Sequence, residues 1–135
     1  MRVQRVQKPV MQALRLPFDH RTDTASLRHA AHGWLISWQD GDVVEDTLLV
    51  ITELVQNVVQ HTGDGGEVAL TGNGQVLVEV FDHSRNLPRL IGPDPRRLGG
   101  RGMLLVDAVS DEWGSRLTAT GKVVWARLPV KPAAS

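Results

Sequence analysis

Three polar residues that could carry chemistry recur at every fourth position of one apolar segment, ITELVQNVVQHT at residues 51–62: Glu53, Asn57 and His61. A helix advances by about 100° per residue, so positions four apart form one slowly drifting stripe. The opposite side of such a helix would be apolar, with Val44, Leu48, Ile51, Val55 and Val58. The pattern predicts a helix that buries one face and presents its acid and amide elsewhere.

The residue types of this stripe suit phosphate chemistry. A carboxylate such as that of Glu53 can act as a general base when it lies within hydrogen-bond reach of the proton. Asn57 offers an amide oxygen, and Mg²⁺ accepts neutral oxygens together with phosphate oxygens and waters. His61 can donate a hydrogen bond to a phosphate near the end of the helix. A polar face that is simply in water, with Asp46 and Gln60 on the same side, explains the pattern equally well.

A second candidate is Gly100-Arg101-Gly102, which opens a short helix. Glycines let the backbone approach a ligand closely, and the free N–H groups at a helix N-terminus attract anions. Arg101, with Arg96 and Arg97 upstream, can add bidentate phosphate contacts. The spacing matches neither a Walker A sequence nor a Rossmann fingerprint, so a plain turn into a helix stays open as an explanation.

The third candidate is Asp82, which ends the apolar run VEVFD before a long loop. A buried carboxylate there could accept a proton from the amino group of a base. An acidic residue that merely caps a turn at a strand end is the alternative.

The elements that position these residues follow from hydrophobic period and turn residues. We expect strands at 11–18, 67–71, 75–82, 113–120 and 123–130, and helices at 23–39, 42–62 and 103–109. Asp42 with Glu45 forms a capping-box pattern at the start of the long helix. Gly72-Asn73-Gly74 and Gly121-Lys122 separate pairs of alternating segments and predict two hairpins.

Strands that are segregated from helices favour an α+β sandwich. We expect an about five-stranded sheet, mixed but mostly antiparallel, with three helices on one face. The predicted organisation is a flexible arm at residues 1–12, one domain at 13–131 and a tail at 132–135.

Composition narrows the class of protein. The chain has 135 residues, no cysteine and zero net charge, which predicts a cytoplasmic globular domain without disulfides or thiolate metal sites. No apolar run approaches the roughly 20 residues of a membrane span. The neutral average and the aromatic content of 4% argue against a nucleic-acid binder.

The charges are nevertheless separated along the chain. No lysine or arginine lies between Arg28 and Arg85, where nine acids occur, whereas residues 85–101 hold five arginines and one acid. This separation suits a small anionic ligand held together with a divalent cation, although solvated faces of opposite sign would give the same pattern.

The order of ELVQNVVQH, a strand ending in Asp82, a long loop and GGRGMLLV resembles the ATPase fold shared by gyrase, histidine kinases and MutL-type repair proteins. The closing segment DEWGSRLTATGKVVWARL is similar to that of the anti-sigma-factor serine/threonine kinases within this fold.

The resemblance implies an ATP site with Mg²⁺. It implies that Glu53 is the catalytic base, that Asn57 binds magnesium, that His61 lies near the phosphates and that Asp82 binds the adenine amino group. The other residues expected to contact nucleotide are Asn86, Gly100, Arg101, Gly102, Met103 and Lys122. The implied partners are a sigma factor and an antagonist protein that is phosphorylated on serine or threonine, and a homodimer is possible.

One departure from the family pattern concerns the adenine side. The usual motif is Asp-x-Gly-x-Gly, whereas this chain reads Asp82-His83-Ser84-Arg85-Asn86. Without both glycines, either a different turn forms beneath the base or ATP binds weakly. A binding module that sequesters a regulatory protein without transferring phosphate is therefore the second hypothesis.

Overall fold

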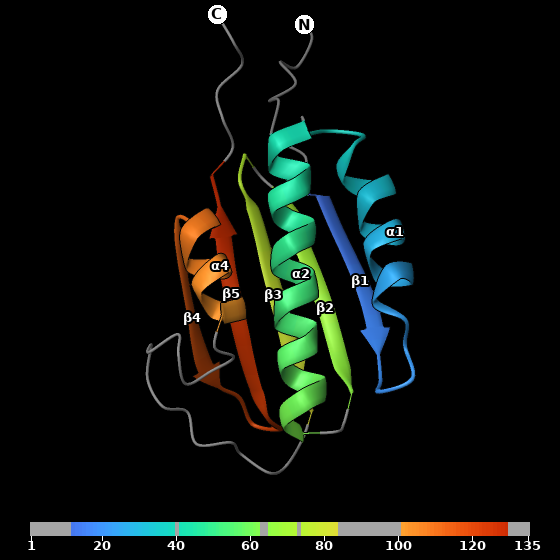
Figure 1. Ribbon diagram of the computed structural model, residues 1–135, viewed down its shortest axis with the longest axis vertical. Coiled ribbons are helices and arrows are strands. Elements are labelled where there is room, and N and C mark those ends of the chain that lie inside the picture. Colours follow the sequence, from blue (N-terminus) through green and yellow to red (C-terminus); the bar gives the residue numbers. More distant parts are fainter. Residues whose placement is uncertain (1–11, 40, 63–64, 73, 84–100, 130–135) are drawn as a thin grey trace, which may run out of the picture.

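The computed structural model describes residues 12–39, 41–62, 65–72, 74–83 and 101–129, and these form a five-stranded sheet with helices packed on one face (Figure 1). The strands are β1 (Gln12–Phe18), β2 (Gly66–Gly72), β3 (Val76–Asp82), β4 (Glu112–Leu117) and β5 (Lys122–Leu128). The helices are α1 (Thr24–Leu35), α2 (Gly41–Thr62) and α4 (Arg101–Val109). The predicted sandwich is confirmed.

The order of strands across the sheet is β1-β2-β3-β5-β4, and each pair of neighbours is antiparallel. The mixed sheet that the sequence predicted is thus wholly antiparallel among the described strands. β1 lies at one edge, as Pro17 predicted, and the hairpin of β2 and β3 forms across residues 73–75, where Gly72 pairs with Val76.

The core lies between the helices and one face of the sheet. Alternate residues of the two central strands are fully buried there, including Val76, Val78 and Val80 of β3. The apolar side of α2 covers them with Val44, Ile51, Val55 and Val58, which are all buried, while Leu48 is half-buried. The apolar stripe predicted for this helix is therefore confirmed.

Three helix boundaries differ from the prediction, one of them being the start of α4 at Arg101 rather than Met103. Asp23 caps α1 as expected, by accepting a hydrogen bond from the Ala25 N–H, but the helix ends at Leu35 rather than near residue 39. The chain turns there, and this brings Trp38 over Gly72, where a Cβ atom would lie 1.9 Å from the indole ring. α2 already includes Gly41, so Asp42 lies in its first turn and is not the predicted cap.

The closing hairpin also differs slightly in its limits. β4 ends at Leu117, and the turn to β5 closes with a hydrogen bond from the Thr118 N–H to the Gly121 carbonyl at 2.9 Å. Lys122 consequently begins β5, one residue before the predicted start, and becomes part of the sheet rather than of the turn.

The second face of the sheet carries no described helix, and its charges pair with one another. Among the described residues, three ion pairs lie on it: Arg15 with Glu67, Arg116 with Glu79 at 3.1 Å, and Arg127 with Glu112. Two of these arginines also cover aromatic rings, since Arg15 lies 6.0 Å from the Phe81 centroid and Arg127 lies 5.6 Å from the Trp125 ring.

Candidate functional site

The polar stripe of α2 faces the N-terminal end of α4. The two helices lie side by side on the sheet (Figure 1), and Oε1 of Glu53 lies only 2.3 Å from the position that a Cβ on residue 102 would occupy. Gly102 therefore permits a close approach between the carboxylate and the first turn of α4. Any side chain at residue 102 would displace this carboxylate.

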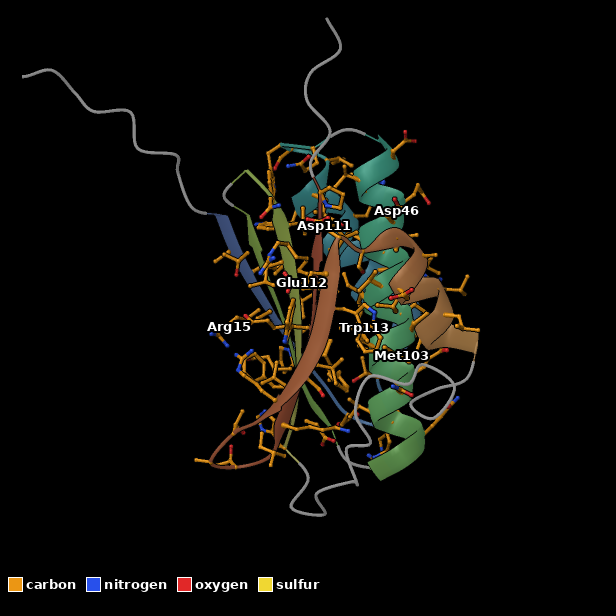
Figure 2. All side chains as sticks on the ribbon, turned by 90° about the vertical axis from the view of Figure 1, so that its left-hand side faces the viewer. Arg15, Asp46, Met103, Asp111, Glu112 and Trp113 are labelled. Carbon is orange, nitrogen blue, oxygen red and sulfur yellow. The ribbon has the colours of Figure 1, made fainter. Side chains whose placement is uncertain are left out.

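A hollow of about 110 Å³ opens where α2 and α4 meet, several times the roughly 30 Å³ share of one water. Its lining consists of Glu53, Gln56, Asn57, Gln60, Gly102 and Met103. Met103 packs beside α2 (Figure 2) and is 1% exposed, so it forms an apolar wall, whereas Glu53 is half-buried. The hollow thus combines a carboxylate, amide groups and the backbone at a helix start.

Burial of polar side chains separates site residues from structural ones. The buried polar residues of the described chain are Thr47, Asn57, Asp82 and Lys122. Thr47 has a local explanation, because its hydroxyl donates to the Val43 carbonyl at 2.7 Å. The remaining three were all predicted from the sequence as site residues. Burying such polar groups costs free energy unless hydrogen bonds or an opposite charge compensate for the lost contact with water.

Asp82 and Lys122 form a second group of buried polar residues, on the sheet. They are direct cross-strand partners at the ends of β3 and β5, and their side chains point to the helix face of the sheet. Both are buried, at 2% and 6% exposure. Burial lowers the pKa of the Lys122 ammonium below its usual value of 10.5, and the nearby charge of Asp82 opposes that shift.

This junction of strands is tightly built. A Cβ on Gly121 would lie 1.9 Å from the Asp82 carbonyl oxygen, so only glycine allows the turn before β5 to approach the end of β3 so closely. The ends of β3 and β5 that carry Asp82 and Lys122 are thereby held together at one end of the sheet.

Comparison with protein families identifies the family of this domain. The family model of the histidine kinase-like ATPase domain matches residues 17–128, which run from the end of β1 to the end of β5. This chain belongs to the histidine kinase-like ATPase domain family. Membership in the family implies ATP binding. No curated protein matches the chain.

The ATPase domain brings together most of the predicted site residues that can be placed. Glu53, Asn57, Gly102 and Met103 line one hollow, and Asp82 lies beside Lys122. His61 and Arg101 are placed only by their backbone, in the last turn of α2 and at the start of α4. Asn86, Gly100 and the other residues of segment 84–100 lie outside the described residues.

Two contributions to this region were not predicted as part of a site. Gln60 was placed on the polar side of the helix only as a solvated residue and Gln56 was not considered, but both line the hollow. Their signal was present, because they lie three and seven residues after Glu53 on the same side of the helix. The contact that ties α4 to the sheet had no such signal in the sequence. The indole N–H of Trp113 on β4 donates to Oδ1 of Asp107 on α4 at 2.8 Å, so Trp113 faces α4 (Figure 2).

The described part of the ATPase domain has no group of three acidic, histidine or cysteine side chains that could enclose a metal ion. The hollow instead offers the oxygens of Glu53 and Asn57, one helical turn apart. Mg²⁺ commonly binds through one or two protein oxygens and completes its shell with waters and phosphate oxygens, so this donor set fits it. None of the described helices is both long enough and apolar enough to cross a membrane.

Proposed function

We propose that this ATPase domain is an ATP- and magnesium-dependent protein serine/threonine kinase. It acts as an anti-sigma-type regulator, which binds a sigma factor and phosphorylates an antagonist protein. The observation that carries the kinase proposal is the position of the Glu53 carboxylate, which lies beside Asn57 and against the first turn of α4. A candidate base therefore lies next to backbone that can hold phosphate.

The proposed reaction transfers the γ-phosphoryl group of ATP to a hydroxyl. The serine or threonine oxygen of the antagonist attacks the γ-phosphorus, the bond to the β-phosphate oxygen breaks, and ADP leaves. Glu53 accepts the hydroxyl proton, and the N–H groups at the start of α4 hold phosphate oxygens. Magnesium on Asn57, when bound, offsets the negative charge of the phosphates.

The acceptor hydroxyl has a clear approach in this proposal. Glu53 is half-buried at the edge of the hollow, and its neighbours Gln56 and Gln60 are exposed. A base that a macromolecule can reach is suited to a protein hydroxyl as well as to water. The regulatory partners of the proposal rest on the resemblance of residues 111–128 to the anti-sigma-factor kinases.

A second candidate function is a regulatory module that sequesters its partner without transferring phosphate. It is favoured by the loss of both glycines after Asp82, where the chain reads His83-Ser84-Arg85-Asn86. In such a module nucleotide would bind weakly, and Glu53 would have no proton to remove.

Calorimetric titration of the full chain with ATP and ADP, with and without Mg²⁺, separates these two functions. For the kinase we expect Mg²⁺ to strengthen ATP binding by roughly tenfold, about 1.4 kcal/mol. Asn57→Ala should remove most of this gain because the magnesium ligand is lost, whereas Asn57→Asp should retain it. Gln60→Ala is the matched control, since Gln60 lines the same hollow without being a predicted ligand.

The same preparations are then tested for transfer of labelled phosphate to protein serine or threonine. An equal effect of Mg²⁺ on the wild type and Asn57→Ala would contradict the magnesium role. Absence of ATP binding by the wild type, with a partner protein still captured, would favour the sequestering module.

A further inference from the structure

A second hollow lies directly beside the candidate site, on the other flank of α2. Its volume is about 210 Å³, and it is lined by His20, Thr22, Thr24, Val55, Gln56, Val59 and Gln60. Gln56 and Gln60 line both hollows. The two spaces are therefore neighbours across a single ridge, which these exposed glutamines form.

Helix geometry explains why the ridge separates two kinds of surface. Consecutive residues stand about 100° apart, so Val55 and Asn57 project to opposite sides of Gln56. The Asn57 side meets α4, where Glu53 lies. The Val55 side meets the segment between β1 and α1, which contributes a histidine and two threonines.

The lining of the second hollow is chemically unlike that of the first. Two valines form its apolar part, threonine hydroxyls and a histidine form its rim, and no carboxylate, lysine or arginine is among the described residues that line it. Apart from the imidazole of His20, these described residues offer no charged group to hold a phosphate or a metal ion. Such a surface suits an uncharged side chain with peptide groups around it.

The two glutamines are suited to contact a polypeptide backbone. Each primary amide can donate and accept hydrogen bonds. Four residues of helix rise about 6 Å, so the two amides lie one above the other along the ridge. A polypeptide segment that crosses the ridge can therefore pair a peptide group with either amide.

The outer wall of the second hollow is held rigidly before anything binds. The Thr22 N–H donates to the Asp19 carbonyl at 3.0 Å, and the Asp19 N–H donates to the Thr22 hydroxyl at 2.9 Å. The Arg21 N–H donates to the Asp19 carboxylate at 2.8 Å, and this bond holds the pKa of Asp19 below its usual value. A preformed wall reduces the entropy lost on binding.

From this juxtaposition we infer that the second hollow holds an uncharged, apolar residue of the acceptor polypeptide, whose chain crosses Gln56 and Gln60 to bring its hydroxyl to Glu53. The inference rests on the proposed function, because it names the substrate of the same base. Crossing a helix of about 10 Å diameter takes about three extended residues, so the seated residue lies about three positions from the serine or threonine.

The test uses fluorescent peptide pools, each with one central serine and one other position fixed, and measures their binding to the full chain by fluorescence polarisation. We expect the wild type to select apolar, uncharged residues about three positions from the serine. Val59→Phe, which fills the hollow, and the double variant Gln56→Ala/Gln60→Ala should each weaken this binding roughly tenfold, about 1.4 kcal/mol. The ATP affinity of Val59→Phe, measured in parallel, should change less than twofold, because Val59 does not line the first hollow.

Glu45→Ala is the control, because Glu45 is an exposed residue of α2 that lines neither of these hollows. It should leave peptide selection unchanged. The exposed glutamines can be replaced without disturbing the core, so the double variant stays informative if Val59→Phe fails to fold.

The outcomes separate the inference from the proposed kinase. Equal peptide binding by the wild type and the double variant, selection of a charged residue at that position, or no binding of any pool would overturn the docking inference. Selective peptide binding without ATP binding or phosphate transfer would overturn the kinase and leave the docking hollow established.

Discussion

The two faces of the sheet differ in whether their polar side chains form surface ion pairs or are buried. On the face without described helices, Glu67 and Glu112 each pair with an arginine of the adjacent strand, and Glu79 of β3 pairs with Arg116 of β4, across β5. On the helix face, Asn57 is buried and lines the hollow between α2 and α4 together with Glu53, and Asp82 and Lys122 are buried at the paired ends of β3 and β5.

This difference teaches how to tell structural charge from candidate chemistry. Exposed pairs such as Arg116 with Glu79 are typically worth no more than about 1 kcal/mol, and they cover a sheet that would otherwise expose aromatic rings. Burying an amide or an ammonium opposes folding unless bonding compensates. Asn57 and Glu53 are the polar groups that meet at the hollow between α2 and α4, and this position supports the proposal of a ligand site there.

The largest expected effect comes from removing one acid on each face. Glu53→Gln keeps the shape of the side chain but removes its basicity, so phosphate transfer should fall at least about 100-fold, the lower end for general base catalysis. Glu79→Gln removes an acid of the open face and should leave transfer unchanged. Initial rates with labelled ATP and a protein acceptor measure both variants.

ATP affinity provides the control for this pair, because the proposed role of Glu53 is proton removal rather than nucleotide binding. Both variants should bind ATP as the wild type does. Equal loss of transfer in Glu53→Gln and Glu79→Gln would show that the two faces do not differ in the way proposed, and an undiminished rate in Glu53→Gln would remove it as the base.

The sequence predicted the helix face well because periodicity encodes it. The four-residue spacing of Glu53 and Asn57 placed both on one side of α2, and the apolar positions opposite them are in the core. Asp82 was found because it ends a strongly alternating strand. Such local signals survive into the fold since each depends on only one element.

What the sequence did not reveal depends on contacts between distant segments. The end of α1 at Leu35 follows from the packing of Trp38 on Gly72, which lies at the end of β2, far along the chain. The hydrogen bond of Trp113 to Asp107 and the cross-strand position of Lys122 beside Asp82 likewise require the assembled sheet. Propensity and period describe single elements, so these pairings were not predictable from them.

Two glycine substitutions test whether the candidate site differs from the rest of the fold. A Cβ on residue 102 would meet the Glu53 carboxylate at 2.3 Å, whereas a Cβ on Gly33 of α1 would meet nothing within 4 Å. Alanine favours a helix over glycine by up to about 1 kcal/mol. We therefore expect Gly33→Ala to raise the free energy of unfolding without changing the transfer rate.

Gly102→Ala should behave differently, because its methyl group pushes the Glu53 carboxylate away from the start of α4. The rate should fall by roughly tenfold, since small displacements of a catalytic group have large effects, while urea unfolding shows little loss of stability. A full rate in Gly102→Ala would mean that the observed position of Glu53 is not the one used in the reaction.

The smallest expected effect concerns one cation on each face, and it appears in the pH dependence of stability. Because burial lowers the pKa of Lys122 in the folded state, the unfolded chain binds more protons between that pKa and the ordinary value of 10.5. The penalty for the buried charge is thus fully present at lower pH and is relieved as pH rises through the folded-state pKa. The free energy of unfolding of the wild type, taken relative to Lys122→Met, should therefore increase toward pH 10.5 in urea titrations.

Arg116→Met, on the open face, is the control. It should lose only its surface ion pair and show no such trend with pH. Parallel curves for the wild type and Lys122→Met would contradict the burial of this charge.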